Sequence, residues 1–409
     1  MYKRNFVILM MIVLSLISYV NVCRGQSAKY HYFNSPSGGR IICAIENEQK
    51  KTVSIVSTVR SRYVEGYWLF SHTIIQGVSG DIEIPSQVEL WLFDALYKID
   101  KKVGLYSIEK LTSQAFVNCE KLRSITLPST IKRIDVKAFD NCPNLVSVNI
   151  PSTVEYINPE SFYNCPLLKS VNVEDGLNTH YSSFNGILCE GGSVVFCPFS
   201  YQGIVNIPAS INEIKENVFQ NHEGITDVVI QNGTKIIGSS AFEGCVSLQK
   251  VILPASVNKF GDNVFKGCTL LKDIQINEGL DRIGSSSFAD CLSLQTIYLP
   301  GSLQYIGPGT FSNCINLELV RFSEGNRYIM DDTFSFCSSL KEVNLPSTIE
   351  LIGVKAFMGC ENLGKVVLPE SIREIGRYAF FGCSALTSIN VPEHTKVYDE
   401  TFLECNNLQ

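Results

Sequence analysis

The stretch FADCLSLQTIYLPGSLQYIGPGTF, residues 288–311, decides the fold because most of the chain repeats this phrase. The phenylalanine that begins the phrase returns every 23 positions, with one longer gap. A fixed period in this range predicts a solenoid, in which each lap packs only on its neighbours. The phenylalanines in this register are Phe116, Phe139, Phe162, Phe219, Phe242, Phe265, Phe288, Phe311, Phe334, Phe357 and Phe380.

The apolar spacing within the phrase predicts the elements of one lap. Residues 288–294 carry an apolar side chain at every third position, which predicts a short helix or 3-10 turn. Ile297–Leu299 alternates as a strand does, and Pro300 ends the strand because it cannot donate to a ladder. Residues 303–306 predict a second short extended segment. We therefore expect an α/β solenoid in which each lap adds one strand to a parallel sheet.

Three segments are expected along the chain. Residues 1–25 predict a signal peptide, residues 26–79 an N-terminal β cap, and residues 80–409 the repeat solenoid. The cap is expected because the end of a solenoid exposes an apolar layer that must be covered. The longer gap, from Phe162 to Phe219, predicts an irregular hairpin insert at about 176–203. The insert is expected to turn at Gly191–Gly192 and to project from one rim of the array.

The first residues have the pattern of a secretory signal. Lys3 and Arg4 are followed by the mainly apolar run Phe6–Val20, and Cys23 and Gly25 precede a cleavage point. An uncleaved signal anchor is the alternative, although the run is short for a membrane span. No second long apolar run follows, so we expect a secreted or surface-held protein without a further transmembrane helix. A chain that stops in mid-lap also predicts truncation, a frayed last lap or end-to-end self-association, and a missing tail would be the place for a membrane anchor.

The composition argues for a folded, mildly acidic protein. Hydrophobic residues make up 45% of the chain and charged residues 18%, and the net charge is −6. That hydrophobic content is enough for a core, and the low charge content excludes a disordered polyelectrolyte. Nucleic acid is not expected as a partner because phosphate binding requires a basic face.

Cysteines repeat in the same register as the phenylalanines and suggest disulfides at first sight. Equivalent side chains in stacked laps point the same way at about 4.8 Å, however, whereas a disulfide needs Cβ atoms near 3.8 Å. We therefore expect a column of buried thiols that pack as small apolar groups. His222 replaces the thiol in one lap, which favours packing over a metal chain. Cys189 and Cys197 flank the predicted hairpin and are the better disulfide candidates.

No catalytic constellation is found in the sequence. The five histidines are scattered, and no phosphate loop, nucleophile elbow or zinc-binding helix motif occurs. Acidic residues at outward strand positions occur singly, without the carboxylate pair of a glycosidase. We expect no enzyme activity, no metal and no cofactor, and a carbohydrate-active hydrolase is the weakest alternative.

The repeat resembles the BspA-like leucine-rich repeat family of microbial surface proteins. The resemblance rests on phrases such as FSNCINL at Phe311–Leu317 and NLPSTIELIG at Asn344–Gly353, and on the variant lap at 178–188. It covers the chain from about Gly80 to its end. It implies a right-handed solenoid, a surface or secreted location, and adhesion to host or neighbouring-cell macromolecules. The family offers no catalytic residue to transfer.

The outward strand positions of the middle laps are the predicted binding face for an extracellular protein or glycan. Aromatic and arginine side chains there would anchor a partner, although an ordinary sheet face is the alternative for each residue. A structural or decoy surface protein without a dedicated ligand is the alternative function. The sequon Asn232-Gly-Thr is a candidate N-glycosylation site at Asn232. The candidate ligand-binding residues are Ile252, Gln275, Thr296, Tyr298, Leu319, Arg321 and Asn344.

Overall fold

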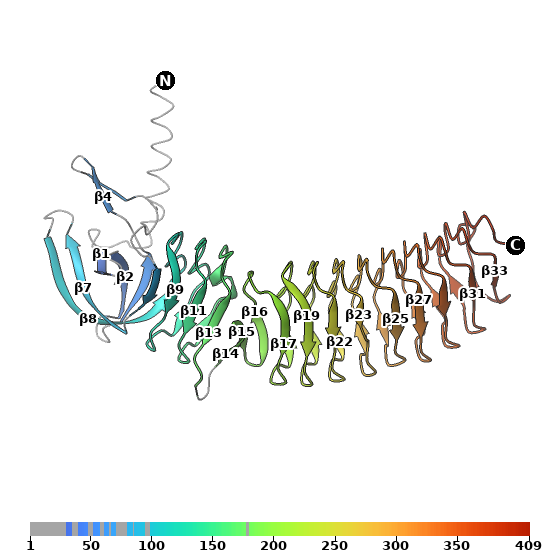
Figure 1. Cartoon of the computed structure of the whole chain (residues 1–409), viewed down its shortest axis with the longest axis horizontal. Coiled ribbons are helices and arrows are strands. Elements are labelled where there is room, and N and C mark those ends of the chain that lie inside the picture. The colour runs from blue at the N-terminus through green and yellow to red at the C-terminus, as the bar shows by residue number, and fades with distance from the viewer. Residues whose placement is uncertain are drawn as a thin grey trace, which may run out of the picture. The chain divides into compact units, whose positions relative to one another are not determined.

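The structure is a computed structural model that describes residues 30–34, 40–47, 52–57, 61–64, 67–70, 80–84, 86–94, 99–176 and 180–409 (Figure 1). The expected signal peptide at 1–25 lies outside the described residues and stays a prediction. Much of the expected cap at 26–79 also lies outside them. The chain divides into two compact units, residues 1–143 with 156–164, and residues 144–155 with 165–409.

The first unit contains a seven-stranded sheet in the order β12-β10-β8-β3-β2-β1-β7. Within the range of the expected cap, β2 and β3 form an antiparallel pair. Two further pairs complete the unit, β4 with β5 in antiparallel and β6 with β9 in parallel. Its strands are β1 (Tyr30–Asn34), β2 (Arg40–Asn47), β3 (Thr52–Ser57), β4 (Ser61–Val64), β5 (Tyr67–Phe70), β6 (Gly80–Glu83), β7 (Gln87–Asp94), β8 (Ile99–Leu111), β9 (Leu122–Thr126), β10 (Arg133–Ile134) and β12 (Tyr156–Ile157).

The repeat begins irregularly in this unit. Residues 87–94 and 99–111 form the long antiparallel pair β7 and β8 instead of a lap. The end of β8 then pairs in parallel with β10, and β10 pairs with β12 one lap later. Among the described residues, the 3-10 helix η2 (Pro159–Phe162) is the one helical element, and Asn158 caps it by accepting a hydrogen bond from the Glu160 amide.

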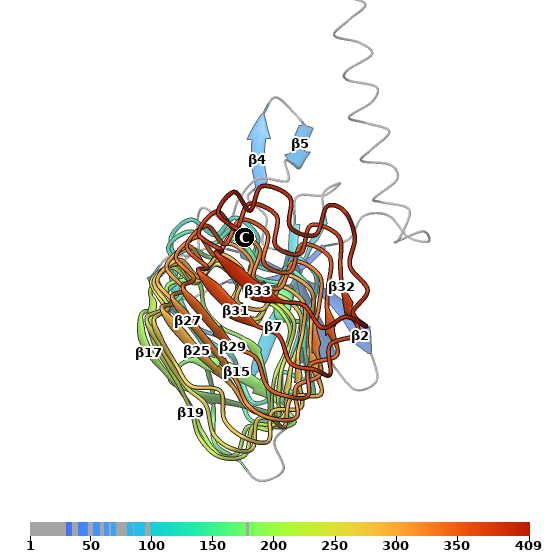
Figure 2. The same cartoon turned by 90° about the vertical axis from the view of Figure 1, so that its right-hand side faces the viewer.

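In the second unit most laps supply two strands, one before the proline position (here called long) and one after it (here called short), and both kinds form parallel ladders. The long strands are β11 (Ser147–Ile150), β13 (Ser170–Val173), β17 (Gly203–Ile207), β19 (Ile225–Ile230), β21 (Lys250–Ile252), β23 (Asp273–Ile274), β25 (Thr296–Leu299), β27 (Leu319–Phe322), β29 (Glu342–Asn344), β31 (Lys365–Val367) and β33 (Ser388–Asn390). The short strands are β18 (Glu213–Ile214), β20 (Ile236–Ile237), β22 (Lys259–Phe260), β24 (Arg282–Ile283), β26 (Tyr305–Ile306), β28 (Tyr328–Ile329), β30 (Leu351–Ile352) and β32 (Glu374–Ile375). Figure 2 shows β31 and β33 on one side of the laps and β32 on another.

The core of the second unit is the stack of equivalent apolar side chains. On β25, Ile297 and Leu299 are buried while Tyr298 is exposed, as strand alternation requires. The phenylalanine rings lie parallel, with Phe288 and Phe311 centroids 5.2 Å apart and their planes 7° from parallel. The Phe288 amide donates to the Thr310 carbonyl at 2.8 Å. Ring stacking and backbone bonds therefore join each lap to the next.

The segment around each phenylalanine is a series of turns with hydrogen bonds between residues three apart, so of the expected short helix or 3-10 turn the laps of the second unit form the turn. The residues two before and two after the phenylalanine have positive φ, as at Ser286 (54°) and Asp290 (61°) around Phe288. Residues in the left-handed region cannot continue a right-handed helix. The three-residue apolar spacing is thus produced by two consecutive turns.

The insert is a hairpin, but it does not project from a rim. Strands β14 (Tyr181–Phe184), β15 (Ile187–Glu190) and β16 (Ser193–Phe196) pair in antiparallel, and Gly191 and Gly192 form the turn with φ of 53° and 81°. Both angles suit glycine, which has no Cβ to oppose them. Strand β16 then pairs in parallel with β18, so the hairpin is a member of the short-strand ladder.

Candidate functional site

The predicted binding residues occupy outward positions on the long strands, a surface that we call the strand face. Tyr298 on β25 is 53% exposed and Ile252 on β21 is 45% exposed. Arg321 on β27 and Asn344 on β29 are also exposed, as is Gln275, directly after β23. Thr296 on β25 and Leu319 on β27 are half-buried.

The structure brings five of these residues together. Parallel pairing sets Thr296 beside Leu319, Tyr298 beside Arg321, and Arg321 beside Asn344. The Arg321 guanidinium lies 5.6 Å from the centroid of the Tyr298 ring, within cation–π range. β25, β27 and β29 therefore present an aromatic ring, a cation and an amide in one row.

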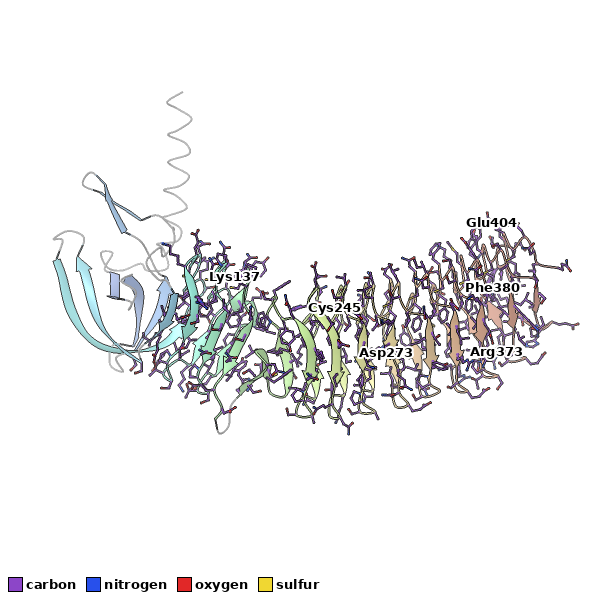
Figure 3. All side chains as sticks on the ribbon, viewed as in Figure 1. Lys137, Cys245, Asp273, Arg373, Phe380 and Glu404 are labelled. Carbon is purple, nitrogen blue, oxygen red and sulfur yellow. The ribbon has the colours of Figure 1, made fainter. Side chains whose placement is uncertain are left out.

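Ile252 and Gln275 belong to a different ladder. Strands β17, β19, β21 and β23 form one sheet, and β25 to β33 form another, without a pairing between β23 and β25. On the first sheet, Lys250 and Asp273 form an ion pair of 2.8 Å, and Figure 3 labels Asp273 on this surface. The charges there neutralise each other and leave the apolar Ile252 exposed beside them.

The cysteine column consists of buried thiols, as expected. Most of these thiols donate to the carbonyl of the phenylalanine in the preceding lap, as Cys314 does to Phe288 at 3.1 Å and Cys337 to Phe311 at 3.2 Å. Burial raises the pKa of the Cys245 thiol to about 12, and it raises the pKa of Cys291 as well. A thiol with a raised pKa is a poor nucleophile, so Cys245 and Cys291 stabilise the array as packed side chains.

Cys189 and Cys197 are thiols in the structure, without a disulfide between them. Cys189 pairs across the hairpin with Val194, and Cys197 lies beyond the end of β16. Burial raises the pKa of Cys189 to about 12 and also raises the pKa of Cys197. Both side chains pack as apolar groups in the core of the second unit.

His222 takes the place of a thiol and is only 2% exposed. Its Nδ1 lies 3.2 Å from the Gln220 carbonyl and its Nε2 lies 3.2 Å from the Cys197 carbonyl. Its ring stacks on Phe199 with centroids 5.1 Å apart. Burial lowers the pKa of His222. The side chain therefore joins the insert to the first regular laps instead of binding a metal.

Asn232 is exposed in the turn after β19, and Thr234 of the same sequon is fully buried. The Thr234 hydroxyl donates to the Ile211 carbonyl at 2.8 Å. The threonine thus has a structural role at a position where most laps carry an aliphatic residue. Glycosylation of Asn232 stays a prediction.

Three unusual residues of one lap were missed by the sequence reasoning. Asn326 stands where the neighbouring laps have Leu303 and Ile349, and Met330 stands where other laps have glycine. Phe336 has a φ of 61° at a position that is Asn or Gly in most laps. A comparison of each lap with the repeat phrase, position by position, would have singled out all three.

No group of three or more potential metal ligands occurs within the described ranges. In the same part of the chain, no helix has the length and apolar character of a membrane span.

The BspA type leucine rich repeat region matches the chain in six copies, over residues 92–189, 192–318 and 281–409. No curated protein matches the chain.

Three solved structures of leucine-rich repeat proteins are similar to this chain. The first, from Bacteroides ovatus, is 23% identical to this chain. The match covers 85% of this chain and 91% of the Bacteroides chain, with a TM-score of 0.60. A leucine rich cell surface protein from Faecalibacterium prausnitzii is 20% identical over 94% of both chains, with a TM-score of 0.41. A T. pallidum leucine rich repeat protein is 26% identical over 46% of this chain and 91% of its own, with a TM-score of 0.40. The first of these supports the fold.

Proposed function

Since the chain belongs to the BspA type leucine-rich repeat family, we propose that it is a secreted or cell-surface adhesin. In this proposal it binds an extracellular protein through the strand face. The signal-like N-terminus and membership of this family support the proposed secreted or cell-surface location. The row of Tyr298, Arg321 and Asn344 on three consecutive strands is the observation that carries the binding surface.

The geometry of this row suits a protein partner. Tyrosine and arginine are the side chains that most often dominate binding energy, because each offers a large apolar surface together with hydrogen-bond donors. β27 and β29 are held by backbone ladders on both sides and β25 by its ladder with β27, so little conformational entropy would be lost on binding. Thr296 and Leu319 flank the row and add apolar contact.

The test is saturable binding of the protein to immobilised extracellular-matrix proteins and to host cells. A Tyr298→Ala/Arg321→Ala double variant should lose at least about tenfold in affinity, which corresponds to about 1.4 kcal/mol. The matched control is Glu213→Ala/Lys215→Ala, which removes an ion pair from the short strand β18 and should leave binding unchanged. Binding that both double variants retain would contradict this surface. The absence of any saturable binding would favour the structural or decoy role.

A further inference from the structure

The short-strand ladder is interrupted at one place. Within the described residues, β18 to β26 pair in succession and β28 to β32 do likewise, but β26 and β28 do not pair. Elsewhere the lap joint is bonded, as where the Gln304 amide donates to the Asp281 carbonyl and the Glu350 amide to the Arg327 carbonyl. No equivalent backbone bond joins Arg327 to Gln304 in this part of the chain. At this joint the backbone N–H and C=O groups of the two laps therefore do not form the hydrogen bonds that they form at the other joints.

Met330 stands at the interruption. The equivalent residues of the neighbouring laps are Gly307 and Gly353, which pack against the backbone of the preceding lap. A Cβ at Gly307 would lie 2.5 Å from the Ser285 nitrogen, and a Cβ at Gly353 would lie 2.6 Å from the Asp331 nitrogen. In these two laps such contacts would be sterically forbidden, so the Cβ and side chain of Met330 need space that the close glycine packing does not leave.

Asn326 makes the opened joint polar. It is 2% exposed, and its Nδ2 donates to the Pro300 carbonyl at 3.1 Å and to the Leu303 carbonyl at 3.3 Å. These carbonyls only accept hydrogen bonds, which fixes the orientation of the amide. Its Oδ1 is buried without a hydrogen-bond partner. An unsatisfied buried acceptor costs about 1–3 kcal/mol, so a donor is expected at this place.

A small cleft lies at the same joint. It has a volume of about 20 Å³ and is lined by Gln304, Tyr305, Asn326, Arg327, Tyr328 and Met330, together with aliphatic side chains. That volume admits one hydroxyl group or one water molecule. The Tyr328 ring at the mouth is 42% exposed, whereas the Arg282 guanidinium lies 4.1 Å from the centroid of the Tyr305 ring and covers it.

The charges of the cleft favour a neutral ligand. Arg327 is paired with Glu350, to which its Nε donates at 2.8 Å. The site therefore offers a buried acceptor, unpaired backbone groups and the Tyr328 ring, which is 42% exposed and has the paired Arg327 guanidinium 5.8 Å from its centroid. A sugar ring has complementary chemistry, because its C–H faces stack on an aromatic ring while its hydroxyl groups donate and accept hydrogen bonds.

We propose that this joint, between β26 and β28, is a binding site for a neutral saccharide, one hydroxyl group of which enters the cleft and donates to Oδ1 of Asn326. The Tyr328 ring stacks on the sugar, and the backbone groups of residues 304–306 and 327–330 bind further hydroxyl groups. This site is on the short-strand ladder and is separate from the strand face of the proposed adhesin function.

Two variants test the site without weakening the fold, because each introduces the residue type of the neighbouring laps. Asn326→Leu removes the buried acceptor, and Met330→Gly allows the joint to close. The intact protein is first applied to an array of neutral, sialylated and sulfated oligosaccharides. The neutral oligosaccharide with the strongest signal is then titrated into each variant by calorimetry. Tyr298→Ala, on the strand face, is the control.

We expect neutral oligosaccharides to bind, with an affinity at least about tenfold lower in Asn326→Leu and Met330→Gly and clearly lower in Tyr328→Ala. Tyr298→Ala should bind as the unmodified protein does, so loss of the strand-face function would leave this result intact. The proposal is overturned if no neutral oligosaccharide binds or if only acidic ones bind. It is equally overturned if Asn326→Leu and Met330→Gly bind normally, or if crystals soaked with the saccharide show only water in the cleft.

Discussion

Phe336 is the residue whose backbone conformation fits its side chain least. Its φ of 61° lies in the left-handed region, where a residue with a Cβ costs about 1–2 kcal/mol and glycine and asparagine are tolerated best. The corresponding residues of the adjacent laps are Asn313 and Gly359. The Phe336 ring is 49% exposed, so its packing contacts offset only part of the free-energy cost of the left-handed backbone.

Phe336→Asn is therefore expected to raise the free energy of unfolding by about 1 kcal/mol. The new amide would also extend a column in which Asn313 Nδ2 donates to Asp290 at 2.7 Å. The measurement is the midpoint of urea denaturation. Phe336→Ala is the matched control, because it removes the ring but keeps a Cβ at positive φ, and it should not stabilise the protein. Equal midpoints for the two variants would argue against backbone strain.

At the scale of the lap, the junction between the insert and the regular repeat depends on one side chain. Each ring nitrogen of His222 lies 3.2 Å from a backbone carbonyl, and the ring stacks on Phe199, where other laps place a thiol. A neutral imidazole has one N–H and can donate to only one of these carbonyls. Its lowered pKa reflects its burial and keeps it neutral in the folded chain.

The lowered pKa predicts a loss of stability at acid pH. As the pH falls through the ordinary histidine value of 6.5, the unfolded chain binds a proton at residue 222 before the folded chain does. The free energy of unfolding then decreases by up to about 1.4 kcal/mol per pH unit until the folded pKa is reached. His222→Cys restores the residue of the other laps and should reduce this dependence.

The measurement compares urea midpoints of the two proteins at about pH 7.5 and about pH 5.5. The other histidines are common to both chains, so the difference in slope isolates residue 222. Identical slopes would contradict the assignment of a neutral, buried imidazole in the folded protein.

At the scale of the whole molecule, the thiol column predicts sensitivity to alkali. Burial raises the pKa of Cys245 from the ordinary value of 9.0 to about 12, and it also raises the pKa of Cys268, Cys291 and Cys314. Below this ordinary value both states keep their protons, and the thiols do not change stability with pH. Above it the unfolded chain loses protons that the folded chain retains, so the free energy of unfolding falls by up to about 1.4 kcal/mol per thiol and pH unit.

The midpoint of guanidinium denaturation should therefore fall steeply between about pH 8 and about pH 10, with a reductant present to exclude disulfides. A Cys268→Ala/Cys291→Ala/Cys314→Ala variant will be less stable at neutral pH because it leaves cavities in the core. Its midpoint should nevertheless fall less over the same pH interval. A slope equal to that of the unmodified protein would show that these thiols do not govern alkaline unfolding.

The sequence by itself determined the repeat, the register of the phenylalanine and cysteine columns, and the outward residues of the strands. It could do so because each lap packs on an equivalent lap, so one period specifies all of these contacts. The spacing of apolar residues could not distinguish a helical turn from two turns with left-handed residues around Phe288, because this spacing does not determine the backbone φ angles. The place of the hairpin was also beyond reach, since the pairing of β16 with β18 depends on contacts between separate laps.

The opened joint was decided by the tertiary structure alone. Asn326 and Met330 are visible in the sequence as departures from the phrase, but each acts through the lap before it. A Cβ at a glycine position matters only because another backbone lies within contact distance, and a buried Oδ1 matters only because no donor reaches it. Contacts that repeat in every lap can be predicted from the sequence of one lap. A contact that occurs in one lap only depends on the geometry of the lap beside it.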